Sequence, residues 1–179
     1  MWQKLPSRQI MMNEYLHGTG KSIVEVGVAL GFFSDYLHSI GPSHLYLIDP
    51  WEQQSNDIYP DKNNKDNTIQ EIRYDNINQK FGHHSNVTII REYSPQATRH
   101  FSPNSIDIVY IDANHSEEAA YTDLNAWWEI VKPNGWLSGH DLKIGVGVYP
   151  AVTRFIKERN TDIRYITKGI LKSYAIQKP

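Results

Sequence analysis

Ser22-Ile23-Val24-Glu25-Val26-Gly27-Val28-Ala29-Leu30-Gly31-Phe32-Phe33-Ser34 is the stretch of sequence that decides the fold. A short apolar run that carries Glu25 leads into two glycines four residues apart, and an amphipathic segment follows. This order predicts a strand, a tight glycine turn and a helix that begins near Phe33. Glycine permits a positive φ and a close approach of a ligand to the backbone, and the start of a helix offers free N–H groups. We therefore expect a nucleotide-binding turn here.

The next predicted strand, residues 44–49, ends in an acid. Asp49 lies 22 residues after Gly27. In nucleotide-binding α/β sheets, an acid near this spacing accepts hydrogen bonds from ribose hydroxyls. A strand-ending aspartate can also cap a turn, but the preceding glycine turn favours ribose binding.

The rest of the chain alternates between predicted strands and helices. Further strands are expected at 87–90, 105–112 and 136–141, helices at 33–40, 66–81, 96–101, 117–131 and 149–159, and a closing hairpin at 163–167 and 173–177. Alternation indicates an α/β fold, with a mostly parallel Rossmann-like sheet, helices on both faces and a C-terminal antiparallel hairpin. We expect one domain over 1–179, with an N-terminal helix within residues 1–20.

Composition excludes several classes of protein. A net charge of −2 leaves no basic footprint for nucleic acid, and the absence of cysteine excludes disulfides and cysteine-bound zinc. No apolar run is long enough to cross a bilayer and the N-terminus lacks a secretion signal, so we expect a cytoplasmic protein that does not bind membranes. A homo-oligomer stays open.

Residues 52–86 form a polar block. Its second part predicts the helix at 66–81, whereas 52–65 lacks periodicity and is expected to be a loop. Such a loop can act as a lid or select the substrate, or it can be a solvated insertion. Trp51 and Tyr59 are the aromatic residues of interest there.

Polar residues follow the predicted strands at the edge where ligands bind in parallel sheets. They are Glu25, Asp49, Ser94, Asp112 and Asp141. Their convergence on one edge predicts an active site.

At this point the chain resembles the class I S-adenosylmethionine-dependent methyltransferases over about residues 20–177. Within them it is similar to the branch that includes macrolide-sugar and catechol-type O-methyltransferases. Four blocks carry the resemblance: VEVGVALG at 24–31, LIDPW at 47–51, DIVYIDANHS at 107–116 and KPNGWLSGHD at 132–141.

The resemblance implies S-adenosylmethionine as the cofactor. Glu25 and Gly27 would line its methionine and ribose side, and Gly31 would let the following helix pack closely. The residues implied to bind the cofactor are Glu25, Gly27, Gly31, Asp49, Pro50, Trp51, Ser94 and Asp112, with Asp49 on the ribose and Pro50, Trp51 and Ser94 near the adenine.

The resemblance also implies catalytic groups and a divalent cation. In the metal-dependent branch, Asp112, His140 and Asp141 would be the ligands. The catechol-type pattern has Asp-Asn where this chain has His-Asp, and a histidine ligand favours Mn²⁺ over Mg²⁺. His115 stands where catechol-type enzymes carry a lysine, which makes it the implied general base beside Asp112; an ordinary imidazole pKa of about 6.5 suits that role.

These observations predict methyl transfer to a hydroxyl group of a small molecule, such as a sugar or a secondary metabolite. Two alternatives remain. A nicotinamide-dependent oxidoreductase or epimerase should carry G-x-G-x-x-G, yet Gly27 is followed only by Gly31. A non-catalytic cofactor-binding protein of the same fold would have no need for acids at four strand ends.

Overall fold

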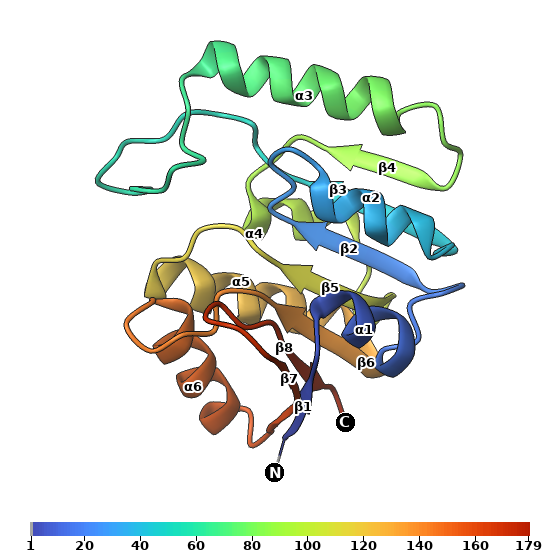
Figure 1. The fold of residues 1–179 in the computed structure, drawn as a ribbon, viewed down its shortest axis with the longest axis vertical. Helices are drawn as coiled ribbons and strands as arrows, with labels where there is room; N and C mark the ends of the chain where they lie inside the picture. Colours follow the sequence, from blue (N-terminus) through green and yellow to red (C-terminus); the bar gives the residue numbers. More distant parts are fainter. Residues whose placement is uncertain (1) are drawn as a thin grey trace.

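A computed structural model describes residues 2–179 and shows one sheet of eight strands in the order β1-β7-β8-β6-β5-β2-β3-β4 (Figure 1). The strands are β1 (Gln3–Leu5), β2 (Ser22–Val26), β3 (His44–Ile48), β4 (Val87–Ile90), β5 (Ile106–Ile111), β6 (Val131–Gly139), β7 (Ile163–Thr167) and β8 (Tyr174–Gln177). Strand β8 is antiparallel to both β6 and β7, whereas every other pair is parallel. The predicted fold class, with its closing antiparallel hairpin, is confirmed.

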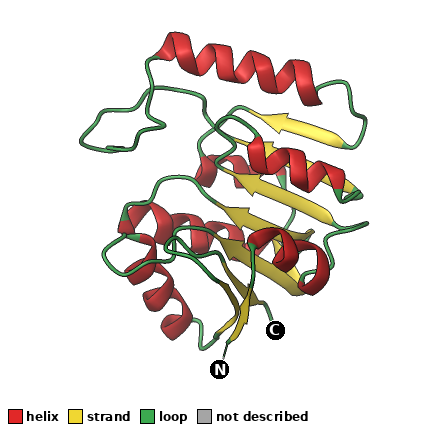
Figure 2. Cartoon of the chain, viewed as in Figure 1, coloured by secondary structure: helices red, strands yellow, loops and turns green. Residues whose placement is uncertain are grey.

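Helices cover both faces of this sheet (Figure 2). They are α1 (Arg8–Ile10), the π-helix Met11–Tyr15, α2 (Phe32–Ser39), α3 (Asn67–Phe81), α4 (Ser94–Ala97), the 3₁₀-helix Thr98–His100, α5 (Glu117–Ile130) and α6 (Val148–Glu158). One buried cluster joins the sheet to α5 and α6, and a second joins it to the N-terminal helices, α2 and α3.

Alternation along β2 shows how the sequence produces these two layers. Val24 and Val26 belong to the α5 side, whereas Ile23 belongs to the α2 side. Successive side chains of a strand point to opposite faces, so a run that is apolar at every position is buried on both. Glu25 therefore points toward α2, where Ser34 meets it.

Two boundaries differ from the sequence-based expectation. Residues 3–5 form β1, which pairs with β7 in parallel, so the N-terminal region contains a strand as well as helix. Strand β6 begins at Val131, five residues earlier than expected, because the Pro133-Asn134-Gly135 turn is accommodated as a register shift against β5 rather than as a loop. The order of the central strands brings β2, β3 and β5 side by side, and their carboxyl ends form the floor of a pocket.

No helix within residues 2–179 is long and apolar enough to cross a membrane. This agrees with the absence of a long apolar run in the sequence.

Candidate active site

A pocket of about 370 Å³ lies at the carboxyl ends of β2, β3 and β5. Its floor is made by the glycine turn after β2 and by the ends of the neighbouring strands, and its walls come from α3, α5 and the loop after β3. Among the predicted cofactor-binding residues, those that line it are Gly27, Asp49, Pro50, Ser94 and Asp112.

The glycines of the turn are favoured by positive φ angles and, at Gly27, by a close approach. Gly27 has φ +89°, and a Cβ there would lie 2.1 Å from the carbonyl oxygen of Asp112. Gly31 has φ +74°, and its Cβ would lie 2.5 Å from Cδ1 of Ile77 on α3. Gly27 thus lets β2 and β5 end side by side. At Gly31 the neighbour on α3 is the flexible end of the Ile77 side chain, so it is mainly the positive φ that favours glycine there. Close packing of the following helix stays a prediction.

Asp49 holds the glycine turn and the start of the loop after β3 through two hydrogen bonds from backbone N–H groups. Its Oδ2 accepts a hydrogen bond from the Ala29 N–H at 2.9 Å, and its Oδ1 accepts one from the Trp51 N–H at 2.8 Å. Burial raises the pKa of this carboxyl, while the backbone donors lower it. Asp49 faces the pocket with oxygens that can accept further hydrogen bonds.

Trp51 is a core residue. Its side chain is 1 % exposed, packs beside Tyr74, and donates its indole N–H to the carbonyl oxygen of Ala29 at 3.1 Å. It is absent from the lining of the pocket. The expectation that its ring lies beside the adenine is therefore corrected, because the positive φ of Trp51 (41°) turns the side chain under the loop.

Glu25 lies beneath the pocket and does not line it. It is buried and accepts a hydrogen bond from the Ser34 hydroxyl at the start of α2. Burial raises its pKa to about 8, although the bond from Ser34 opposes this. Any influence on a bound cofactor would pass through the turn rather than through direct contact.

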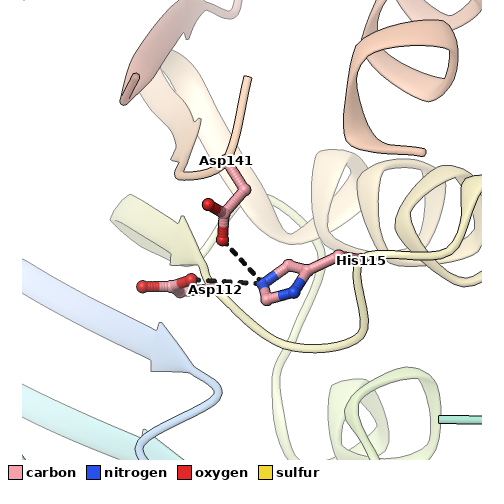
Figure 3. Close-up of side chains that lie close together, drawn as sticks. All are labelled: Asp112, His115 and Asp141. Atoms are coloured by element: carbon pink, nitrogen blue, oxygen red, sulfur yellow. Dashed lines mark ion pairs between the residues drawn. The ribbon is translucent and has the colours of Figure 1, made fainter. Parts of the chain in front are cut away.

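Asp112, His115 and Asp141 form a compact cluster (Figure 3), and Asp112 also lines the pocket. Asp112 ends β5, His115 lies in the loop that leads to α5, and Asp141 follows β6. His115 Nε2 is 2.8 Å from Asp141 Oδ2 and 3.5 Å from Asp112 Oδ1. One ligand atom from each residue lies within 4.8 Å of the others, a spacing that suits one metal ion.

His140 lies at the edge of this cluster. Its Nδ1 is 3.4 Å from Asp141 Oδ1 and 3.8 Å from Asp112 Oδ1. The predicted ligand set contained His140, whereas the structure brings His115 into the centre in its place. The reason is local: the loop after β5 folds back toward the sheet and points the His115 ring at both carboxylates.

The cluster is chemically suited to a cation. Two carboxylates and one imidazole form a mixed oxygen and nitrogen ligand set, which is typical of Mn²⁺ and related transition metals more than of Mg²⁺. Moreover, the buried Nε2 of His115 faces both carboxylates without a well-aligned hydrogen bond. The residues therefore fit the metal that the sequence pattern suggested.

The charge of His115 bears on its predicted role as general base. Burial lowers its pKa, but the neighbouring Asp112 and Asp141 outweigh this and raise it to about 10. Burial disfavours the charged form of Asp141 too and so acts to raise its pKa. The imidazoles of His115 and His140 outweigh this and hold the pKa of Asp141 far below its usual range. With these neighbours His115 carries its proton at neutral pH. In this state it cannot act as the general base that the resemblance implied.

Arg8 is a site residue that the sequence did not reveal. It begins α1, and its guanidinium lies 4.1 Å from the centre of the Phe33 ring and 3.3 Å from Asp112 Oδ2. It also donates to the Tyr110 hydroxyl at 3.4 Å. The N-terminal helix thus brings a cation to Asp112, which lines the pocket. Arg8 has no motif around it that could have identified it in advance.

The segment between β3 and α3 covers one side of the pocket. Tyr59 and Asn63 line it, and the Asn63 carbonyl accepts a hydrogen bond from Arg73 on α3 at 2.8 Å. On the other side, Asn114 donates to the Ile58 carbonyl at 3.2 Å, and Asp61 lies 3.6 Å from His115 Nδ1. This polar loop is thus part of the pocket lining. Figure 1 shows that the segment projects beyond the strand ends.

Comparison with known proteins identifies the family. Residues 24–142 match the model of a methyltransferase domain, which is more than half of the chain. The sequence matches no functionally curated protein at a significant level.

Solved structures share the fold at low sequence identity. A protein of Corynebacterium glutamicum is 12 % identical with a TM-score of 0.67, over 98 % of this chain and 84 % of that one. The N-methyltransferase NodS of Bradyrhizobium japonicum is 14 % identical with a TM-score of 0.65, over 96 % and 94 %. Spermidine synthase of Thermotoga maritima is 17 % identical with a TM-score of 0.60, over 96 % of this chain and 60 % of its own.

Proposed function

The chain belongs to the family of proteins with a methyltransferase domain, and from this premise we propose that it transfers a methyl group from S-adenosylmethionine to a hydroxyl group of a small molecule. The observation that carries the proposal is that Asp112 belongs both to the lining of the pocket and to the cluster that it forms with His115 and Asp141. A cofactor in the pocket would therefore meet an acceptor held at the cluster. The family assignment removes the support for a nicotinamide-dependent enzyme.

Residues of the chain would bind and orient the two substrates. Asp49 would accept hydrogen bonds from the ribose hydroxyls of the cofactor, and Gly27 would allow its close approach to the ends of β2 and β5. Methyl transfer is an in-line displacement, so alignment of the acceptor oxygen, methyl carbon and sulfur contributes most; well-oriented reactants gain on the order of 7–11 kcal/mol. The wall made by residues 52–66 would select the acceptor and exclude water.

The cluster would prepare the acceptor hydroxyl. Asp112, His115 and Asp141 would hold a divalent cation, which would lower the pKa of a hydroxyl bound to it. In this arrangement His115 is a ligand, and the proton on its Nε2 must leave before the metal binds. The two carboxylates supply the negative charge of the site. Arg8 donates to Oδ2 of Asp112, whereas His115 lies beside its Oδ1.

Binding and turnover test this proposal separately. Calorimetric titration should show binding of S-adenosylmethionine and none of NAD; binding of NAD alone would contradict it. Labelled S-adenosylmethionine should then be offered with matched pairs of small hydroxyl and amine acceptors. Transfer confined to the amines would leave a methyltransferase but would exclude the hydroxyl acceptor.

A further inference from the structure

Asp123 is a buried carboxyl group that the proposed methyl transfer does not use. It lies on α5 in the wall of the cofactor pocket, and 4 % of its surface is exposed. Burial of a carboxyl group costs free energy unless hydrogen bonds compensate for it. A group of this kind in the wall of a pocket therefore suggests that the ligand supplies one of those bonds.

The hydrogen bonds around Asp123 fix which of its oxygens is free. The indole N–H of Trp127, which can only donate, donates to Ser94 Oγ at 2.9 Å. Ser94 in turn donates its proton to Asp123 Oδ1 at 2.6 Å. Within residues 2–179, Ser94 is the one side chain that donates to this carboxyl group. Within the same residues Oδ2 accepts no hydrogen bond and is not fully buried, and it belongs to a residue that lines the pocket.

The protonation state of Asp123 depends on the group that a bound ligand presents to it. Burial raises its pKa to about 7, while the bond from Ser94 opposes this. At neutral pH a ligand N–H that points at Oδ2 would hold the group in its ionised form, which accepts a hydrogen bond and cannot donate one.

We propose that Asp123 determines the specificity of the pocket for adenine by accepting, through Oδ2, a hydrogen bond from the exocyclic amino group of the cofactor. The inference rests on the proposed function, because it requires an adenosyl cofactor in this pocket. Ser94, which the sequence analysis placed near the adenine, would then act through Asp123 as its positioning residue. Asp49, on the ribose side, lines the same pocket from the end of β3.

Two ligands that differ at this edge of the purine test the inference on the full chain. S-adenosylhomocysteine carries the amine, whereas S-inosylhomocysteine carries a carbonyl oxygen in its place and a proton on the neighbouring N1. Calorimetry with the wild-type protein at about pH 8, above the pKa of Asp123, should show at least about tenfold tighter binding of the adenosyl compound, because an ionised Oδ2 has no proton to donate to the inosyl oxygen. Equal affinities in the wild-type protein would overturn the inference, whatever the variants do.

Asp123→Asn gives a sharper test because its geometry is fixed by Ser94. The Ser94 hydroxyl donates, so it selects the amide oxygen and turns the amide N–H₂ toward the pocket. This variant should therefore reverse the preference and bind S-inosylhomocysteine more tightly. Asp123→Ala should bring the two affinities within about threefold of each other.

Glu117→Gln is the matched control, since Glu117 is an exposed carboxylate on the same helix outside the pocket lining. It should keep the wild-type ratio. Retention of that ratio by Asp123→Asn, with a normal circular dichroism spectrum, would overturn the inference alone. Failure of the wild-type protein to bind either compound would overturn both the inference and the proposed function.

Discussion

His115 Nε2 and Asp141 Oδ2 are 2.8 Å apart, although they stand on loops that follow different strands. Adjacent β5 and β6 bring these loops together, since Ile111 pairs with Gly139 at the last rung of the two strands. The contact joins the blocks at 107–116 and 132–141, two of the four that carry the resemblance. It also places positive charge between two carboxylates, and this charge dominates the chemistry of the site.

Asp141→Asn should lower the pKa of His115 from about 10 toward its ordinary value. The folded-state pKa of His115 lies above the unfolded one, and that of Asp141 lies below its ordinary value of 3.8. This contact therefore stabilises the fold fully between about pH 4 and pH 6.5, and it loses its effect as the pH rises through 10 or falls below about 4. At pH 7 the variant should lose about 1–3 kcal/mol of unfolding free energy. NMR titration of the His115 ring in the presence of chelator measures the pKa, and urea unfolding measures the stability.

Asp61→Asn is the control for this variant. Asp61 lies 3.6 Å from His115 Nδ1 but belongs to the loop after β3. It should change the His115 pKa by much less than Asp141→Asn does. Equal effects of the two variants would show that the overall negative charge around His115, and not the contact with Asp141, raises its pKa.

Metal binding should depend on His115 and not on His140. Removal of divalent ions by EDTA should suppress turnover, and Mn²⁺ should restore it at lower concentration than Mg²⁺. Added Mn²⁺ should also raise the melting temperature of the wild-type protein and of His140→Ala, because binding to the folded state stabilises it. His115→Ala should lose this rise. The reverse pattern would support the ligand set that the sequence suggested, and indifference to all ions would exclude a metal.

Gly27→Ala should disrupt the site by collision as well as by backbone strain. Its Cβ would lie 2.1 Å from the Asp112 carbonyl oxygen, so β2 and β5 must move apart. We expect a loss of about 2–4 kcal/mol in unfolding free energy and at least tenfold weaker binding of S-adenosylhomocysteine. Urea unfolding and calorimetry measure the two effects.

Gly145→Ala measures the cost of the positive φ alone, without a collision of the added Cβ. Gly145 has φ +87°, close to the +89° of Gly27, yet a Cβ there would meet nothing within 4 Å. This variant should lose only about 1 kcal/mol. Equal losses in the two alanine variants would contradict the role of the contact between the turn and Asp112.

The sequence predicted most of the sheet because the signals for it are local. Alternating apolar strands and amphipathic helices, together with the glycine turn, predicted a mostly parallel sheet and the edge that carries the site. At that edge Asp49, Ser94 and Asp112 line the pocket, and Asp112 and Asp141 belong to one cluster. The strand at residues 3–5 was not predictable in the same way, because three residues carry no period and their pairing with β7 joins the two ends of the chain.

The finer features of the site depend on contacts between distant segments. Trp51 is apolar and follows Asp49 closely, which fits a ligand platform and a core residue equally well; only the packing with Tyr74 decides. Arg8 reaches Asp112 across 104 positions of the chain. Asp123 reads as an ordinary polar position of an amphipathic helix until Ser94 is placed beside it.

Glu25→Gln should remove a pH dependence of stability that the buried carboxyl creates. The folded-state pKa is about 8, raised by burial, and the unfolded value is 4.5. The folded state therefore holds the proton more tightly, so stability from this group is fully present below about pH 4.5 and is lost as the pH rises to about 8. Glutamine has no charge to bury, and its carbonyl oxygen can still accept the bond from Ser34.

The difference in unfolding free energy between Glu25→Gln and the wild-type protein should thus shift in favour of the variant from pH 5 to pH 8.5, by an amount on the order of a few kcal/mol. Urea unfolding at several pH values measures it, and groups that titrate in both proteins cancel in the difference. Ser34→Ala provides the opposite test. The Ser34 hydroxyl stabilises the ionised carboxylate, so its removal should raise the Glu25 pKa further and steepen the loss of stability. Parallel stability curves for all three proteins would mean that Glu25 is ionised throughout, held by Arg8 and the turn despite its burial.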